Sequence, residues 1–315
     1  MQVKFIDEKK FLKYNFKTKP YQHQYDAFDK SKEKKYYALF MEQGTGKSKV
    51  IIDNIAYLYR RGNIDTAIIA APKGVYRNWH ASEFRSHMPE DVVSFTDICI
   101  WNPTETKTNI ERLTEFLKPS HKLKFFIINI EALSTEKGKN YLQRLLNTTK
   151  SFFCIDESTN IKNRTARRTK ACMKLGKLAT YRRILTGTPV TQGPLDLWSQ
   201  MHFLDEFILQ SSFYAYRNTF CVIQRRRTSS HSFDEVVGYQ RLDELQKILD
   251  EHSFRVTKEE CLDLPPKLRQ IRHIDMTPAQ KRMYVILKKR AILELEREKL
   301  VTAPLIITRI LRLQQ

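Results

Sequence analysis

A glycine-rich turn between an apolar run and an amphipathic stretch constrains this chain more than any other feature. Residues 36–40 (YYALF) read as a buried strand, and the sequence MEQGTGKS follows at residues 41–48. Apolar residues then recur at helical spacing from Val50 to Leu58. A strand, a glycine loop ending in Gly-Lys-Ser and a helix whose N-terminus faces the loop together form a phosphate-binding unit. The chain is therefore predicted to build an α/β fold around a parallel sheet.

The residue types in this loop suit a nucleoside triphosphate. Glycines allow backbone N–H groups to approach phosphate oxygens, Lys47 would reach the β- and γ-phosphates, and the Ser48 hydroxyl would ligate magnesium. Met41 stands where the general pattern begins with glycine, which favours helicase-like ATPases over small-nucleotide kinases. The alternative is a glycine turn before an ordinary helix.

The rest of the first two-thirds of the chain predicts a doubly wound lobe, because short apolar runs alternate with amphipathic stretches. The predicted strands cover residues 36–40, 66–71, 98–101, 124–130, 152–155 and 182–185, and the predicted helices between them cover residues 75–84, 110–117, 140–146 and 166–178. In such a sheet, ligands bind beyond the carboxyl ends of the strands.

Beyond residue 189 the pattern becomes helical and rich in aromatic residues. Helices are expected at residues 195–203, 213–220 and 242–249, an exposed basic loop at 225–231, a strand at 268–276 and a long charged helix at 278–300.

The charge of the chain indicates a polyanionic partner. The formal net charge is +20 over 315 residues, and this excess favours nucleic acid or an anionic membrane surface. No apolar run is long enough to span a bilayer, and no signal-peptide core is present at the N-terminus, so membrane attachment is not expected. The five cysteines are scattered and form no Cys-x-x-Cys pair, which is typical of reduced thiols in a cytoplasmic protein.

Paired carboxylates end the predicted strand at residues 152–155. Asp156 would hold magnesium, directly or through water, and Glu157 would polarise the water that attacks the γ-phosphate. An exposed acidic pair at a helix start is the alternative, but the phosphate loop upstream favours the catalytic interpretation.

A third element, Leu185-Thr186-Gly187-Thr188-Pro189, follows the strand at residues 182–185 and supplies two hydroxyls at the sheet edge. A turn closed by proline is the alternative. With these three elements in order, the chain resembles the superfamily 2 helicases and translocases, and within them the Swi/Snf-like ATPases. Residues 41–48, 156–159 and 185–189 correspond to motifs I, II and III.

Weaker matches extend the resemblance along the chain. Residues 20–27 are similar to the adenine-reading element of the family, where Gln24 fits better than Gln22. Residues 71–79 resemble motif Ia, which lies on the nucleic-acid backbone in the family, and Trp79 within it is expected to pack in the core. Residues 161–163, 195–198 and 264–267 resemble Swi/Snf hallmarks.

The resemblance implies ATP and magnesium as cofactors and assigns a role to each matching residue. The implied catalytic residues are Lys47, Asp156 and Glu157; the nucleotide-binding residues are Gln24, Gln43, Gly44, Thr45, Gly46, Lys47 and Ser48; the magnesium ligands are Ser48 and Asp156; the coupling residues are Thr186, Gly187 and Thr188; and the nucleic-acid contacts are Lys73, Arg77, Asn78, Lys162 and Arg164.

A series of basic residues follows motif II without an acidic residue among them. Its members are Lys162, Arg164, Arg167, Arg168, Lys170, Lys174, Lys177, Arg182 and Arg183. They predict either a sequence-independent, salt-sensitive contact with nucleic-acid phosphates or a solvated helix face. The cluster Arg225-Arg226-Arg227 has the same two interpretations.

The resemblance also predicts a domain organisation. Residues 1–190 would form an N-terminal RecA-like ATP-binding lobe, residues 191–262 a helical extension, and residues 263–315 a linker to a second RecA-like lobe that this chain lacks. Because the second lobe carries the arginine finger of the family, poor hydrolysis is expected from the chain alone. Thr159 replaces a histidine of motif II, so hydrolysis is expected to survive with altered coupling. The motif spacing suggests a phage or bacterial source.

The predicted function is an ATP-dependent translocase on nucleic acid, with double-stranded DNA favoured over RNA. A strand-separating helicase shares the same motifs. A nucleotide- and nucleic-acid-binding module without turnover is the alternative from another class.

Overall fold

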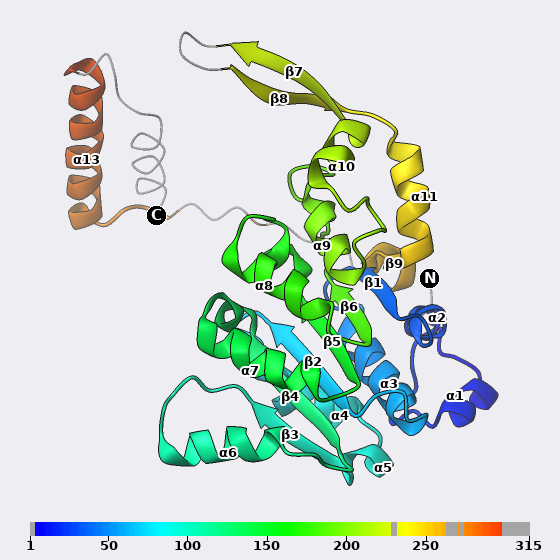
Figure 1. Ribbon diagram of the computed structural model, residues 1–315. Coiled ribbons are helices and arrows are strands. Elements are labelled where there is room, and N and C mark those ends of the chain that lie inside the picture. Colours follow the sequence, from blue (N-terminus) through cyan, green and yellow to red (C-terminus); the bar gives the residue numbers. More distant parts are fainter. Residues whose placement is uncertain (1–3, 228–231, 263–269, 271–273, 298–315) are drawn as a thin grey trace. The chain divides into compact units, whose positions relative to one another are not determined.

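A seven-stranded sheet with the order β3-β4-β2-β5-β6-β1-β9 forms the centre of the larger of two compact units (Figure 1). The computed structural model describes residues 4–227, 232–262, 270 and 274–297, and the chain divides into two compact units, Met1–Leu264 and Pro265–Gln315. The strands of the sheet, all in the first unit, are β1 Tyr36–Met41, β2 Thr66–Ala71, β3 Thr96–Ile100, β4 Leu123–Asn129, β5 Ser151–Asp156, β6 Tyr181–Leu185 and β9 Ser253–Val256. Every neighbouring pair is parallel, which confirms the predicted α/β class.

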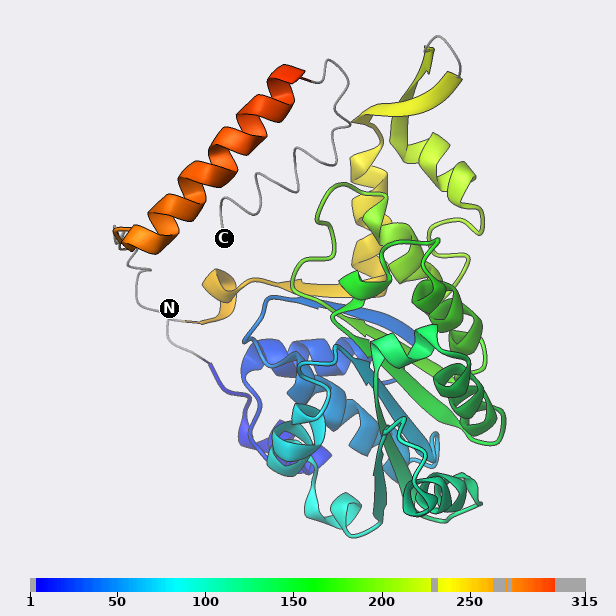
Figure 2. The ribbon, with the colours of Figure 1, turned by 90° about the vertical axis from the view of Figure 1, so that its left-hand side faces the viewer.

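Helices cover both faces of this sheet (Figure 2). One layer contains α2 Gln22–Ser31, α3 Lys47–Arg60, a π-helix Trp79–Phe84 and α5 Glu90–Val93; the other contains α6 Lys107–Leu117, α7 Glu136–Asn147, α8 Arg167–Gly176, α9 Asp196–Leu204, α10 Phe213–Phe220 and α11 Leu242–His252. Successive residues of β1 point to opposite layers, with Leu39 in the first and Phe40 in the second. This alternation is the period-2 pattern of a strand that is buried on both faces.

The six strands predicted for the sheet are all present, with ends within two residues of those expected. The sequence did not predict β9, which pairs in parallel with β1 at the edge of the sheet. It has four residues, and Arg255 within it is exposed. A strand this short with a charged residue carries too little periodicity to be recognised.

The predicted helix at residues 75–84 is only partly correct. Residues 75–77 belong to a turn, and the π-helix begins at Trp79, after its N-cap Asn78, and continues into the short α4 Arg85–His87. The N-terminal α1 Glu8–Tyr14 was not predicted; its N-cap Asp7 accepts a hydrogen bond from the backbone of Lys10. The 3-10 turns Ile130–Ser134 and Ser158–Ile161 follow β4 and β5.

The predicted loop at residues 225–231 is wrong over its described part. Strands β7 Cys221–Arg227 and β8 Ser232–Tyr239 form an antiparallel hairpin, and residues 228–231 lie outside the described residues. Cross-strand charge pairing explains the difference, because Arg226 Nε lies 2.6 Å from Glu235 Oε2. Like charges next to each other in sequence are tolerated when a carboxylate faces them from the partner strand.

After β9 the first unit ends with the short helix α12 Lys258–Cys261. The second unit contains α13 Pro278–Arg297, which confirms the predicted charged helix over the residues described. The strand predicted at residues 268–276 falls mostly outside the described residues, and residues 274–276 have no regular structure. None of the described helices is long and apolar enough to cross a membrane.

Candidate active site

The phosphate loop connects β1 to α3, and its glycines are required by backbone conformation. Gly44 and Gly46 have φ values of 84° and 89°, in the left-handed region that other residues enter at a cost. A Cβ atom at Gly46 would also collide with the side-chain amide of Gln24. Both glycines therefore maintain a loop whose backbone N–H groups can turn toward an anion.

Lys47 is the buried cation of this loop. Its side chain is 8% exposed, and Nζ donates a hydrogen bond to the Met41 carbonyl at 3.0 Å. Burial lowers the pKa of Lys47, and the nearby carboxylates of Glu157 and Asp156 oppose that effect. An ammonium group with so little water around it gains strongly from a phosphate.

Asp156 and Glu157 end strand β5 on the same side of the sheet. Both oxygens of Asp156 accept hydrogen bonds, Oδ2 from Trp79 Nε1 and Oδ1 from the Glu157 backbone, each at 3.0 Å. Burial raises the pKa of Asp156, and the Trp79 hydrogen bond opposes that rise. Glu157 has φ of 50°, an uncommon conformation for a non-glycine residue. Trp79 is buried as expected, but the sequence did not predict its hydrogen bond.

The segment after β6 contacts both of these elements. Thr186 is fully buried, and its hydroxyl donates a hydrogen bond to Glu157 Oε2 at 3.3 Å. A Cβ atom at Gly187 would lie 3.1 Å from the Gln43 backbone nitrogen, so only glycine allows this approach without displacement of the loop. The Thr188 backbone donates to the Thr186 hydroxyl at 3.2 Å. The structure thus brings motifs I, II and III together at one edge of the sheet.

The Gln24 amide connects the start of α2 to the phosphate loop. Nε2 donates to the Thr45 carbonyl at 3.2 Å, and Oε1 accepts from the Tyr21 backbone at 3.1 Å. His23 Nε2 lies 2.9 Å from the same Thr45 carbonyl. The sequence singled out Gln24 for the adenine base, whereas its contacts with the loop, and the neighbouring role of His23, emerge only from the structure.

The oxygen atoms available to a metal suit magnesium. Ser48 lies in the first turn of α3. Burial raises the pKa of the Glu83 carboxyl group, and the nearby Ser48 side chain partly offsets that rise. Magnesium takes one or two carboxylates and completes its shell with phosphates and water. Across the described ranges no three His, Cys, Asp or Glu residues form a metal cluster. A magnesium ion held by Ser48 and Asp156 would have to complete its shell with phosphate oxygens and water.

The loop after β2 presents three of the predicted nucleic-acid residues to solvent. Lys73, Arg77 and Asn78 are all exposed. The Lys73 backbone donates to Glu131 Oε1 at 3.4 Å, and Arg77 Nε donates to the Tyr76 hydroxyl at 3.2 Å. These contacts orient the loop, and neither of them uses the Lys73 side chain.

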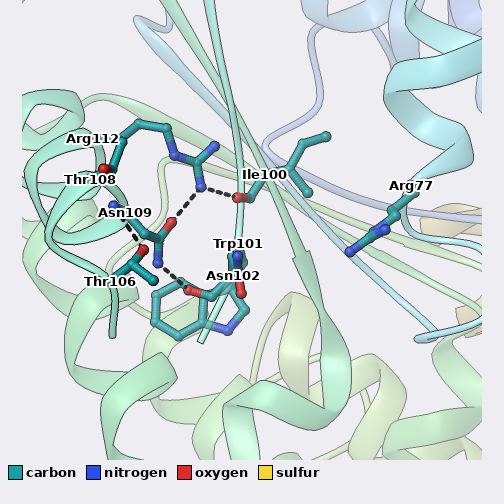
Figure 3. Close-up of a pocket in the computed structure, with 8 residues that line it drawn as sticks. All are labelled: Arg77, Ile100, Trp101, Asn102, Thr106, Thr108, Asn109 and Arg112. Carbon is teal, nitrogen blue, oxygen red and sulfur yellow. Dashed lines mark hydrogen bonds between the residues drawn. The ribbon is translucent and has the colours of Figure 1, made fainter. Parts of the chain in front are cut away.

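Arg77 also lines a cavity of about 430 Å³ beside the end of β3 (Figure 3). Arg112 enters the same cavity from α6, where its guanidinium donates to the Ile100 carbonyl at 2.7 Å and to Asn109 Oδ1 at 3.0 Å. The lining residues are Arg77, Ile100, Trp101, Asn102, Thr106, Thr108, Asn109 and Arg112, none of them acidic. The cavity is separate from the phosphate loop, and the sequence did not single out Arg112.

Lys162 and Arg164 are used within the fold. Lys162 Nζ lies 3.7 Å from Asp196 Oδ2 and contacts the Thr191 hydroxyl. The Arg164 guanidinium stacks over Phe213, with 4.2 Å to the ring centroid. Both side chains are half-buried, so they link the segment after motif II to α9 and α10.

For the last two residues of the basic series, both predicted environments, a contact with nucleic acid and a solvated helix face, are wrong. Arg182 and Arg183 lie on β6 and are buried, 8% and 0% exposed. Arg183 donates to the carbonyls of Ser31 and Lys34, both at 2.7 Å, and burial lowers its pKa to about 10. These two arginines cannot contact nucleic acid, because they belong to a central strand.

A phosphate loop, a strand-end carboxylate pair and a Thr-Gly-Thr turn at one edge of a parallel sheet define the class of RecA-like ATPase lobes. The family model described as SNF2-related domain matches residues 27–315. The chain therefore belongs to the SNF2-related family and carries an SNF2-family ATPase domain.

Two curated relatives give the extent of the similarity. The human "SWI/SNF-related matrix-associated actin-dependent regulator of chromatin subfamily A containing DEAD/H box 1" is 28% identical over 79% of this chain and 23% of its own length. The TATA-binding protein-associated factor MOT1 of Saccharomyces cerevisiae is 31% identical over 51% of this chain and 9% of its own length. The chain thus spans less than a quarter of the length of each of these two relatives.

Solved structures support the fold. The Sulfolobus solfataricus SWI2/SNF2 ATPase core in complex with dsDNA superposes with a TM-score of 0.60, at 20% identity, over 96% of this chain and 59% of that chain. The same core domain without DNA in its description gives 0.53. These eukaryotic and archaeal proteins give no support to the phage or bacterial source suggested by the motif spacing.

Proposed function

We propose that this chain is the nucleotide-binding lobe of an ATP-driven translocase on double-stranded DNA. The observation that supports this most strongly is the convergence of Lys47, Asp156, Glu157 and Thr186 at one edge of the sheet. Hydrolysis of the γ-phosphate needs a cation at the phosphates, a metal ligand and a group that orients water. This edge holds one candidate for each.

The roles follow from the chemistry of each group. Lys47 binds the β- and γ-phosphates, and Ser48 and Asp156 hold magnesium, which supplies charge neutralisation when it is bound. Glu157 orients the attacking water. The hydrogen bond from Thr186 fixes the position of the Glu157 carboxylate and connects it to the segment that follows β6. Gln24 stabilises the loop through its hydrogen bond to the Thr45 carbonyl. The family resemblance assigns the adenine base to the same residue.

DNA as the partner is supported by charge and by similarity. The net charge is +20, and the loop with Lys73, Arg77 and Asn78 is exposed beyond the carboxyl end of β2. The structural neighbour with a TM-score of 0.60 is described in complex with dsDNA. Arg112, which shares a cavity with Arg77, extends the candidate contact surface toward α6.

Turnover by the isolated chain is expected to be slow. An arginine supplied from elsewhere is worth about 10³ to 10⁵ in rate for related nucleotide hydrolysis, and the proposed source is a second lobe. Thr159 lies in the 3-10 turn Ser158–Ile161 directly after Glu157, where a change of side chain would affect coupling more than hydrolysis.

The test is Lys47→Ala in the protein that carries this domain, with Lys122→Ala as the control. Lys122 is exposed at the opposite end of the sheet, paired with Asp97. ATP hydrolysis is measured with duplex DNA, single-stranded DNA and RNA. We expect Lys47→Ala to lower DNA-stimulated hydrolysis at least about a hundredfold and Lys122→Ala to leave it unchanged.

The same assay separates the alternatives. Undiminished hydrolysis in Lys47→Ala would sink the assignment of the phosphate loop. Stimulation by single strands together with strand separation would favour a helicase. Nucleotide binding without turnover, even with DNA and a complete second lobe, would leave a binding module.

A further inference from the structure

A lysine from a distant part of the sequence lies against the phosphate loop. Strand β9 pairs with β1, and the Glu42 backbone nitrogen donates to the Val256 carbonyl at 3.0 Å. Two residues later, the Lys258 backbone nitrogen donates to Glu42 Oε2 at 2.8 Å. These two bonds attach the start of α12 to the second residue of the loop.

The Lys258 side chain then lies beside Gly44. A Cβ atom at Gly44 would be 3.4 Å from Lys258 Cε and 3.7 Å from Lys258 Nζ. The side chain is half-buried, and no carboxylate of the described residues lies within ion-pair distance of its ammonium group. Lys258 also acts on Lys47, since its charge adds to burial in lowering the pKa of Lys47.

Two cations at one glycine loop are unfavourable unless an anion is bound between or beside them. A lysine ammonium is a mobile point charge on a flexible stem and binds phosphate well in that form. Lys258 is anchored through its backbone, so its side chain is free to follow the position of the phosphates. Lys47, by contrast, already donates to the Met41 carbonyl.

We propose that Lys258 is a second phosphate-binding cation of this site, which contacts the di- or triphosphate tail of the nucleotide held by the loop at residues 41–48. The inference rests on the proposed function, because it requires that the loop binds a nucleotide. It adds a residue outside the phosphate-loop motif. It also connects the nucleotide to the segment that follows β9, so that nucleotide binding to the loop changes the contacts of α12.

The test compares nucleotide affinities of three variants with those of the unchanged chain. Lys258→Gln removes the charge, Lys258→Arg keeps it, and Glu259→Gln changes an exposed neighbour on α12 as the matched control. The backbone bond to Glu42 is retained in all of them. Binding of N-methylanthraniloyl-ATP is measured by fluorescence, with ATP, ADP and AMP as competitors, and thermal unfolding is recorded without nucleotide.

We expect Lys258→Gln to weaken ATP and ADP about tenfold, the effect of one charge-assisted hydrogen bond. AMP affinity and the unfolding temperature should not change, and Lys258→Arg should bind ATP nearly as well as the unchanged chain. Equal ATP affinity in Lys258→Gln and the unchanged chain would overturn the inference alone. An equal loss for AMP with a lower unfolding temperature would also overturn it, because Lys258 would then only support the loop. If the unchanged chain binds none of these nucleotides, the proposed function fails first.

Discussion

The sheet edge with motifs I, II and III differs from the series of basic residues after motif II. Position in the sequence predicts side-chain contacts in the first region and does not predict them in the second. At the edge, residues from three separated motifs contact one another. Thr186 donates a hydrogen bond to Glu157, and Gly187 packs against the backbone of Gln43. In the basic series, residues of the same charge have unrelated environments. Arg164 stacks on Phe213, whereas Arg183 is fully buried.

The difference has a physical origin. Glycines and strand-end carboxylates are required by backbone geometry and by phosphate chemistry, so their spacing carries information about contacts. A positive charge can be used for an ion pair, a stack on an aromatic ring, a carbonyl cage or a phosphate. Charge along a sequence therefore indicates a polyanionic partner for the whole chain, but not which side chains touch it.

The largest expected effect at the edge is that of Glu157→Gln. Loss of the carboxylate removes the group that orients water and should lower DNA-stimulated hydrolysis about 10²- to 10⁴-fold. The amide is nearly the same size and can still accept the hydrogen bond from Thr186, so ATP binding should persist. Hydrolysis under saturating ATP and equilibrium binding of labelled ATP check both halves. Hydrolysis within threefold of the parent would remove Glu157 from the proposed mechanism.

On the other side of the comparison, Arg183→Met tests whether a basic residue of the series is structural. The Lys34 carbonyl would lose its donor from Arg183, and the Ser31 carbonyl would keep only the Lys34 backbone as a donor. An unpaired buried acceptor costs about 1 to 3 kcal/mol. We expect the free energy of unfolding to fall by about 3 kcal/mol, measured by urea denaturation with an unchanged slope. Lys170→Met, at an exposed position of α8, should leave it unchanged. Equal stability of the two variants would contradict the carbonyl-cage role.

A smaller effect is expected from Trp79→Phe, which keeps the ring in the core and removes the donor to Asp156. Groups that orient a metal ligand are typically worth about 10- to 100-fold in metal affinity. We expect the magnesium concentration for half-maximal hydrolysis to rise about tenfold, with little change in the maximal rate. The control is Trp198→Phe, whose indole donates to the Gln210 carbonyl away from the site. An unchanged magnesium requirement in Trp79→Phe would show that the hydrogen bond does not position Asp156.

Trp79 also marks how far the sequence could predict the site. Its burial was predictable from its place in an amphipathic stretch, but its partner lies 77 residues away on β5. The strands and the three motifs were predictable because apolar periodicity and glycine positions are local signals. Lys258 was not, since it reaches Gly44 only through β9, an edge strand of four residues. The hairpin β7–β8 was missed for a related reason, because Arg226 meets its partner Glu235 only when the two strands pair.

The smallest effects are expected for the lysine and arginine residues predicted to contact nucleic acid. Exposure to solvent divides these residues into two pairs. Lys73 and Arg77 are exposed on the loop after β2, whereas Lys162 and Arg164 are half-buried and engaged with Asp196 and Phe213. Each lost phosphate contact lowers the slope of log affinity for DNA against log salt by about one.

Lys73→Ala with Arg77→Ala should therefore lower that slope by about two and weaken duplex binding several-fold at ~0.1 M salt. Lys162→Ala with Arg164→Ala should leave the slope unchanged and instead lower the unfolding temperature, because it removes an ion pair and an aromatic stack that connect motif II to α9 and α10. Fluorescence anisotropy over a range of salt concentrations, with thermal unfolding of the same samples, measures both. The reverse pattern would mean that the residues engaged in the free chain exchange their protein partners for phosphates when DNA binds, and the division between structural and DNA-binding charges would then have to be drawn from the bound state.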